Sequence, residues 1–154
     1  MKEWFKHEFG YVNIDSENLY LTNTGNWSET KILTEKTKKV ASQNDARSSS
    51  IIGFMIMVLC ILAYLNFKNI VSGRVAVTLI ILSIIGCYKL YDYLKAEIGA
   101  KFKIPHENIS EIKINNRSIE IIFINGEGKN DNYKLHKVEE KGIAIMISLP
   151  KYVA

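Results

Sequence analysis

The sequence is poor in cysteine, and its first residues do not have the pattern of a secretory leader. Only two of its 154 residues are cysteines, Cys60 and Cys87, and both lie inside an apolar stretch. This usage excludes the disulfide framework of a small secreted protein. The opening residues, MKEWFKHEFGYVNI, mix charged with aromatic side chains and hold no apolar run, so we expect no signal peptide.

Motifs for catalysis and for cofactor or metal binding are also lacking. The segment NGEGKN has the glycines of a hairpin turn without the helix that follows a phosphate-binding loop, and no G-x-S-x-G or H-E-x-x-H motif occurs. His7, His106 and His136 are not spaced as metal ligands. The adjacent Glu139 and Glu140 are more typical of a helix start than of a catalytic pair. We therefore expect a protein that is not an enzyme and that holds no cofactor and no metal.

Charge is scarce only in the middle of the chain. Residues 1–50 carry seven Lys or Arg and seven Asp or Glu, residues 101–154 carry nine and seven, and residues 51–100 carry four and two. The near balance within each polar part argues against nucleic-acid binding. A soluble domain does not usually gather its apolar residues in one block, so we divide the chain into 1–47, 48–94 and 95–154.

Two stretches of the middle part have the length and composition of membrane-spanning helices. Between Arg47 and Lys68, twenty uncharged residues reach about 30 Å as a helix, the thickness of the hydrocarbon layer. In the second stretch Lys89 stands near the end, where it could pair with Asp92 or extend to the head groups. The alternative is a buried helical hairpin, but a chain of this length cannot bury two such helices. We expect spans at about 48–67 and 75–94.

The short connection between the spans makes them antiparallel, so both termini lie on one side of the membrane. Nine Lys or Arg flank that side, whereas only Lys68 and Arg74 lie in the connection. The positive-inside rule therefore places both termini in the cytoplasm. The richness in Lys, Asn and Ile is typical of an AT-rich bacterial genome, which makes the membrane the bacterial inner membrane.

Small residues within the spans are candidates for helix packing, because they let two backbones approach closely in lipid. They are Gly53, Cys60, Ser83, Gly86 and Cys87. The two cysteines could meet as a redox pair, although packing is the simpler interpretation. Neither span holds an ionisable residue at mid-depth, which argues against a transporter or channel that acts alone.

Lysines beside the spans are candidates for contact with anionic lipid, at about 1 kcal/mol each. They are Lys36, Lys38, Lys39, Lys95, Lys101 and Lys103. The alternative is that they only determine the topology.

Both polar parts have the pattern of short strands separated by turns. Before the spans we expect strands at 9–14, 19–22 and 27–34, with a short helix at KEWFKHEF that packs on the β-domain or lies on the membrane. Residues 35–50 are a linker or a polar extension of the first span. After the spans we expect strands at 109–114, 119–124 and 133–138 and a tight NNRS turn. A helix at 139–148 closes the chain, with a strand at 143–149 as the alternative.

Neither polar part can form a domain by itself, because three short strands bury too little surface to offset the entropy of ordering them. Both parts emerge on the same side of the membrane. We therefore expect an α+β membrane protein in which a two-helix transmembrane hairpin is inserted into one cytoplasmic antiparallel β-domain.

The segments LYLTNTGNW and IPHENISEIKINNRSIEIIF resemble bacterial PH-like domains attached to transmembrane hairpins. The similarity lies in an early L-x-L-T strand and a later I-P-x-x-x-I-x-x-I entry into a hairpin. The resemblance implies a PH-like β-domain with a closing helix, and a binding or scaffolding role in place of an active site.

Three functions fit these expectations. The first is a membrane-anchored scaffold whose PH-like domain binds another protein through a groove or an edge strand. The second is an accessory subunit of a larger transport, secretion or respiratory complex. The third is an immunity protein against a membrane-acting toxin. The expected partners are membrane lipids and another protein, and a second copy of the chain is a further candidate.

Overall fold

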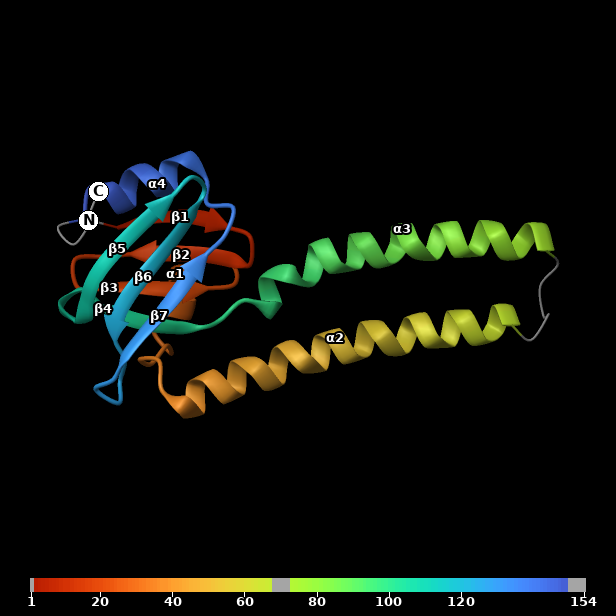
Figure 1. The fold of residues 1–154 in the computed structure, drawn as a ribbon, viewed down its shortest axis with the longest axis horizontal. Coiled ribbons are helices and arrows are strands. Elements are labelled where there is room, and N and C mark those ends of the chain that lie inside the picture. Colours follow the sequence, from red (N-terminus) through yellow and green to blue (C-terminus); the bar gives the residue numbers. More distant parts are fainter. Residues whose placement is uncertain (1, 68–72, 150–154) are drawn as a thin grey trace.

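Two antiparallel sheets pack against each other, and a pair of long helices projects from one end of them (Figure 1). This computed structural model describes residues 2–67 and 73–149. Its elements in chain order are β1 (Glu3–His7), β2 (Gly10–Ile14), β3 (Asn18–Thr22), α1 (Trp27–Thr30), α2 (Lys38–Phe67), α3 (Gly73–Ile98), β4 (Phe102–Pro105), η1 (His106–Asn108), β5 (Ile109–Asn115), β6 (Ser118–Ile124), β7 (Asn130–Leu135) and α4 (Glu140–Ile147).

The first sheet joins segments from both sides of the helix pair. Its strand order is β1-β2-β3-β4, and all neighbours are antiparallel. Strand β3 precedes α2 and β4 follows α3, and the two pair with Leu19 opposite Ile104 and Leu21 opposite Phe102. The prediction that strands before and after the helices share one sheet is confirmed.

The second sheet, β5-β6-β7, comes entirely from the part after the helices. Strands β5 and β6 meet at a tight turn in which Asn116 has φ 56°, a left-handed conformation that asparagine tolerates better than most residues. Both strands and the NNRS turn agree with the sequence prediction. Strand β7 covers 130–135, where the sequence predicted 133–138.

The core lies between the two sheets and contains side chains of alternating positions. In β6, Ile119, Ile121 and Phe123 are buried while the intervening residues are not, as expected for a strand with one face inward. The rings of Phe102 and Phe123 stack across the core with centroids 6.1 Å apart. Burial of each such side chain contributes about 1.5–3 kcal/mol.

Helix α4 covers one end of the sandwich, as Figure 1 shows. It buries Met146 and Gly142. A Cβ at Gly142 would lie 2.4 Å from the ring of Phe5, so only glycine allows this approach. The predicted C-terminal helix is confirmed, and the alternative strand at 143–149 is wrong.

Two predicted elements before the helices are wrong. The predicted helix at KEWFKHEF is strand β1, in which Phe5 and His7 are buried while Trp4 and Lys6 are exposed. This alternation suits a strand, and the pairing with β2 supplies its partner. The sequence also gave no strand at 102–105, where β4 lies.

The predicted strand at 27–34 begins instead with helix α1. The side chain of Asn26 accepts a hydrogen bond from the Ser28 N–H at 2.9 Å and so caps the helix. The Glu29 carboxylate accepts bonds from the N–H groups of Asn23 and Thr24. These local bonds from side chains to the backbone compete with a strand.

The helix pair is long and antiparallel. Helix α2 has 30 residues and α3 has 26, which corresponds to about 45 and 39 Å. Because α2 begins at Lys38, residues 38–50 are the polar extension of the first span, which was one of the two predicted alternatives. The predicted connection at 66–74 lies mostly outside the described residues.

The facing sides of the helices carry half-buried residues at helical spacing. These are Ile51, Met55, Val58 and Leu62 in α2, and Ser83, Cys87, Leu90 and Leu94 in α3. Two of the five predicted packing residues, Ser83 and Cys87, therefore lie on the facing sides. Gly53, Cys60 and Gly86 are exposed, and a Cβ at either glycine would meet nothing within 4 Å. The predicted packing role of Gly53, Cys60 and Gly86 is therefore wrong, because these residues lie away from the facing sides of the helices.

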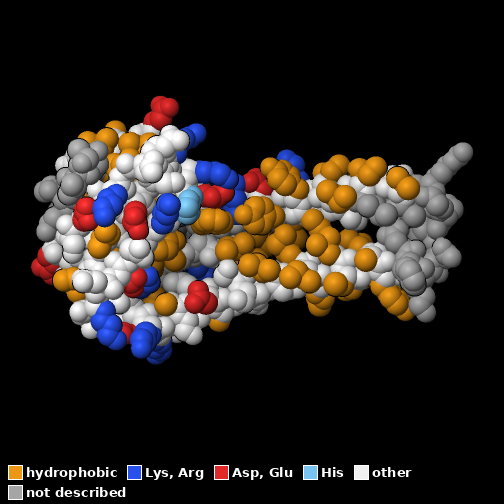
Figure 2. Space-filling view, in the orientation of Figure 1, with side chains coloured by type: hydrophobic (Ala, Val, Ile, Leu, Met, Phe, Trp, Pro, Cys, Tyr) orange, Lys and Arg blue, Asp and Glu red, His pale blue; other side chains and the backbone are white. Residues whose placement is uncertain are grey.

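Apolar side chains cover the outside of the helix pair, as Figure 2 shows. Within the described residues, one helix, Lys38–Tyr64, is long and apolar enough to cross a membrane, and none of its apolar stretch is buried in the chain. Of the two expected spans, only the first meets this criterion of length and composition within the described residues, so the expectation of two spans at 48–67 and 75–94 is met only in part.

Candidate functional site

Lys36, expected beside the membrane, is part of the domain structure. Its ammonium group lies 2.8 Å from the Asp131 carboxylate and 5.7 Å from the ring centroids of Phe102 and Phe123. Only 20% of its side chain is exposed. Burial alone would raise the pKa of Asp131, but hydrogen bonds from Lys36 and Asn125 outweigh it and hold that pKa below its usual range. Lys36 thus fastens the segment before α2 to β7, and it is engaged in this contact instead of facing lipid.

The other five predicted lysines do not form one patch. Lys38 and Lys39 are exposed on the first turn of α2, while Lys103 is half-buried on β4. Lys95 forms an ion pair with Asp92, and Lys101 lies 4.0 Å from Glu97. Asp92 therefore forms its ion pair with Lys95, which lies three residues after it, and not with Lys89, for which pairing with Asp92 was one of the two predicted roles.

Both long helices are attached to the β-domain by polar contacts at their inner ends. Arg47 of α2 donates a hydrogen bond to the carbonyl oxygen of Gly99. The Asn44 side chain bonds to both the N–H and the carbonyl of Lys101, at 3.3 and 3.4 Å. The Asn23 side chain donates to Glu97 at 2.7 Å. These bonds determine the direction in which the helices leave the domain.

The start of α2 is also held by the second sheet. The Lys38 N–H donates to the Glu127 carboxylate at 2.7 Å, and this bond lowers the pKa of Glu127. The adjacent Gly126 N–H donates to the Lys36 carbonyl at 2.9 Å. These contacts could not be predicted from sequence patterns, because Glu127 lies 89 positions from its partner.

Of the three histidines, His7 is the one that is buried in the core. His7 is buried, and burial together with nearby His136 lowers its pKa to about 4, so that it is neutral. Its Nδ1 accepts a hydrogen bond from the Phe9 N–H at 3.3 Å. Across residues 2–67 and 73–149, no group of three His, Cys, Asp or Glu side chains is arranged to hold a metal ion.

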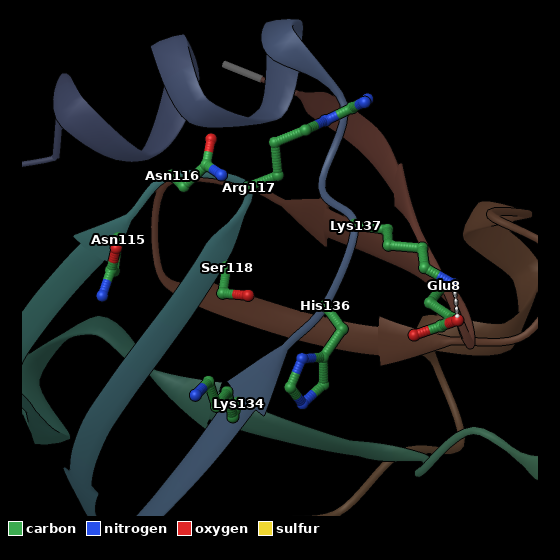
Figure 3. Close-up of a pocket in the computed structure, with 8 residues that line it drawn as sticks. All are labelled: Glu8, Asn115, Asn116, Arg117, Ser118, Lys134, His136 and Lys137. Carbon is green, nitrogen blue, oxygen red and sulfur yellow. Dashed lines mark hydrogen bonds and ion pairs between the residues drawn. The ribbon is translucent and has the colours of Figure 1, made fainter.

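A shallow hollow of about 380 Å³ lies at the turn from β5 to β6, beside the ends of β1 and β7 (Figure 3). Its lining includes Arg117, Lys134 and Lys137. Lys137 is paired with Glu8, and the Nε of Arg117 donates to the Val138 carbonyl at 3.3 Å. Figure 3 shows the Arg117 and Lys134 side chains extending in different directions. Because these cations do not converge on one point, the hollow does not form an anion site.

The backbone edges of the sheets offer a clearer candidate. The β1 edge is covered by the segment before α4, since Glu139 N–H donates to the Lys6 carbonyl at 3.2 Å and Glu8 N–H to the His136 carbonyl at 2.8 Å. The β4 edge is covered by residues 34 and 35, through a bond from the Lys103 N–H to Thr34. The β7 edge is contacted at one point, where the Lys36 ammonium group donates a hydrogen bond to the Asn132 carbonyl at 3.3 Å.

Strand β5 has no such cover. In the part of the chain that the structure describes, no backbone group of Ser110–Asn115 bonds outside its own sheet. A register shift between Ile109 and Glu111 and an exposed ion pair between Glu111 and Lys113 interrupt the start of this edge. Such features limit unspecific pairing of edge strands, so the regular stretch at residues 112–115 is the candidate binding edge. The sequence predicted the strand but could not single it out, because exposure of an edge depends on what the rest of the chain covers.

Comparison with protein-family models, with curated proteins and with solved structures finds no match to this chain.

Proposed function

We propose that the chain is a non-enzymatic membrane-anchored binding protein. Helices α2 and α3 cross the bacterial inner membrane as a hairpin and hold a PH-like β-domain at its cytoplasmic surface. The domain binds an extended segment of another protein along β5. The observation that carries this proposal is the large number of apolar side chains that α2 and α3 leave exposed.

The free energy of that exposed surface supports insertion in lipid. Most of the exposed large apolar residues lie on these helices: Ile52, Phe54, Ile56, Met57, Leu59, Ile61 and Tyr64 on α2, and Val77, Ile81, Leu82, Ile84, Ile85, Tyr88, Tyr91 and Tyr93 on α3. Most of these side chains are about half exposed, so at roughly 1 kcal/mol for each their exposure to water would cost on the order of 15 kcal/mol. That cost is as large as the net stability of a typical domain.

The pairing of β3 with β4 supports a second crossing. Residues before α2 and residues after α3 belong to one sheet, so both helices start from the same side. If α2 crosses the membrane, the chain must cross back through α3 to return to that sheet. The count of nine basic residues against two then favours a cytoplasmic β-domain.

The β-sandwich supports the PH-like assignment by its four-plus-three strand arrangement and its closing helix. Half-buried Ile114 of β5 and half-buried Ile145 and Leu149 of the C-terminal segment pack against the core. An added strand at β5 with alternating apolar residues could cover such side chains while its backbone pairs with the edge.

A second copy of the chain is a poor occupant of this edge. Two β5 strands would pair antiparallel about a two-fold axis perpendicular to the sheet. In Figure 1 this sheet and the helix pair both extend in the plane of the picture. The rotation would point the second hairpin away from the membrane that holds the first, so a different protein is the expected partner.

Hydrogen–deuterium exchange on the full chain in lipid nanodiscs tests the binding edge. We expect the amides of 112–115 to exchange faster than those of β6 in the isolated protein, because an edge lacks partners on one side. A partner co-purified from native membranes should slow exchange at 112–115 specifically. Equal protection of β5 and β6 without a partner would show that the edge is already covered and would refute the proposal.

The exposed outer faces of α2 and α3 favour one alternative, an accessory subunit whose hairpin contacts other membrane helices. In that case a membrane protein should co-purify in a stoichiometric amount even with a variant whose β5 edge can no longer bind a partner, because the helices make the contact. A secreted toxin as the partner would instead support the immunity role.

A further inference from the structure

The junction of α3 with the first sheet contains a hollow of about 340 Å³. Its lining includes Lys6 of β1, Glu8 of the following turn and Tyr11 of β2, and Lys89, Asp92, Tyr93 and Lys95 of α3. Figure 2 shows Lys and Arg side chains gathered with acidic ones where the helices meet the β-domain.

The carboxylates of this hollow are already neutralised. Glu8 pairs with Lys137, and Asp92 pairs with Lys95. Lys89 and Lys6 form no ion pair among the residues that the structure describes, and the Lys6 ammonium lies 5.9 Å from the centroid of the Tyr11 ring. Asp92, which is paired with Lys95, also acts on both of these ammonium groups, but more weakly than on Lys95. The hollow therefore keeps an excess of positive charge, with Lys6 on the β-domain and Lys89 on α3.

The position of the hollow along α3 determines what can reach it. Lys89 directly follows the uncharged part of α3, and the side chains of Tyr88, Tyr91 and Tyr93 beside it are exposed. Tyrosine and lysine gather at the level of the lipid head groups. With the hairpin in a bilayer, the hollow opens at that level.

We propose that this hollow binds the phosphate of an anionic phospholipid head group, between Lys6 on the β-domain and Lys89 on the helix. This inference rests on the proposed membrane hairpin. A phosphate in this place would pair with both ammonium groups while its acyl chains follow the apolar surface of α3. The bound lipid would then link the β-domain to the bilayer at a second point besides the helices.

The test uses the full chain in nanodiscs made of equal parts of phosphatidylglycerol and phosphatidylcholine. Native mass spectrometry of the released protein gives the ratio of the two lipids that it retains. We expect the wild-type protein to prefer phosphatidylglycerol. This preference should fall about fivefold for each lysine removed, in the single variants Lys6→Gln and Lys89→Gln and in the double variant that combines them. The matched control, Lys31→Gln with Lys134→Gln, removes the same charge from two exposed positions of the β-domain and should keep the wild-type preference.

Three results would overturn the inference. They are an equal loss in both variant pairs, no loss in either, or displacement of phosphatidylglycerol by soluble glycerol phosphate, which would make a free phosphate the ligand. If the double variant does not fold, Lys89→Gln alone serves, because this residue is exposed on α3. Recovery of the protein in detergent-free buffer without lipid is a different result, since it refutes the hairpin itself.

Discussion

Substitution of Gly99 by alanine should loosen the joint between α3 and the β-domain. A Cβ at this position would lie 1.8 Å from the carbonyl oxygen of Phe9. Real Cβ atoms essentially never approach another atom within 3.0 Å. The turn between β1 and β2 must therefore move by at least the difference, 1.2 Å. Because the obstacle is backbone and not the end of a flexible side chain, no rotamer change relieves it.

The cost has two parts. Overpacking of this kind costs about 1–3 kcal/mol. The same shift displaces the Gly99 carbonyl that accepts a hydrogen bond from Arg47, and a bond from a charged donor contributes about 1.5–3 kcal/mol. Allowing for partial relaxation, we expect a loss of about 3 kcal/mol in the free energy of unfolding.

Urea unfolding followed by tryptophan fluorescence measures this loss. Trp4 and Trp27 are the only tryptophans of the chain, and both lie in the β-domain, so the signal reports on that domain alone. With a slope of about 2 kcal/mol per molar urea, the midpoint should fall by about 1.5 M.

Gly86→Ala is the matched control, since it lies on the same helix and its added Cβ would meet nothing within 4 Å. It should leave the midpoint unchanged. If Gly99→Ala were as stable as Gly86→Ala, the close approach of residue 99 to the β1–β2 turn would be refuted.

Three further predictions use the same unfolding assay. His7 has its pKa lowered to about 4, so the unfolded chain binds the extra proton first and stability falls as the pH drops below about 6.5. We expect the free energy of unfolding to fall by about 2 kcal/mol from pH 7 to about pH 5. The variant His7→Asn should not show this fall, because asparagine does not titrate there and its side-chain oxygen can still accept the hydrogen bond from the Phe9 N–H. Asp131 has a lowered pKa, so its contribution to stability is complete above the usual carboxyl pKa of about 4 and is lost as the pH falls below that value and through the lowered pKa. Asp131→Asn should therefore destabilise at pH 7 and lose its effect in acid, and an effect independent of pH would refute the ion pair with Lys36. Glu127→Gln should leave the start of α2 intact, whereas Glu127→Ala should cost about 1 kcal/mol; equal midpoints would refute the cap on Lys38.

Elements with strong local patterns were predictable. The β-branched run of β6 alternates inward and outward residues over seven positions, and the NNRS turn indicates where β5 ends. Helix α4 followed from apolar residues at helical spacing, and the two long helices from their length and composition. In each case the pattern lies within one stretch of sequence.

Short elements that depend on a distant partner were not predictable. Strand β4 has only four residues. It is stabilised as a strand by its pairing with β3, from which the two long helices separate it in the sequence. Strand β1 was predicted as a helix because its alternation of Trp4, Phe5, Lys6 and His7 is too short to decide without β2. Helix α1 depends on hydrogen bonds from Asn26 and Glu29 that compete with an extended chain.

The sequence by itself determined where the apolar helices lie and that the flanking parts needed each other, because both follow from composition and from the surface that a short strand can bury. Only the tertiary structure decided what each charged residue does. Lys36 and Lys89 are alike in sequence terms, yet the first is held between Asp131 and two aromatic rings and the second stands at the wall of an open hollow. The physical reason is that the role of a charge depends on partners that folding brings near, and the partner carboxylate of Lys36, on Asp131, lies 95 positions away in the sequence.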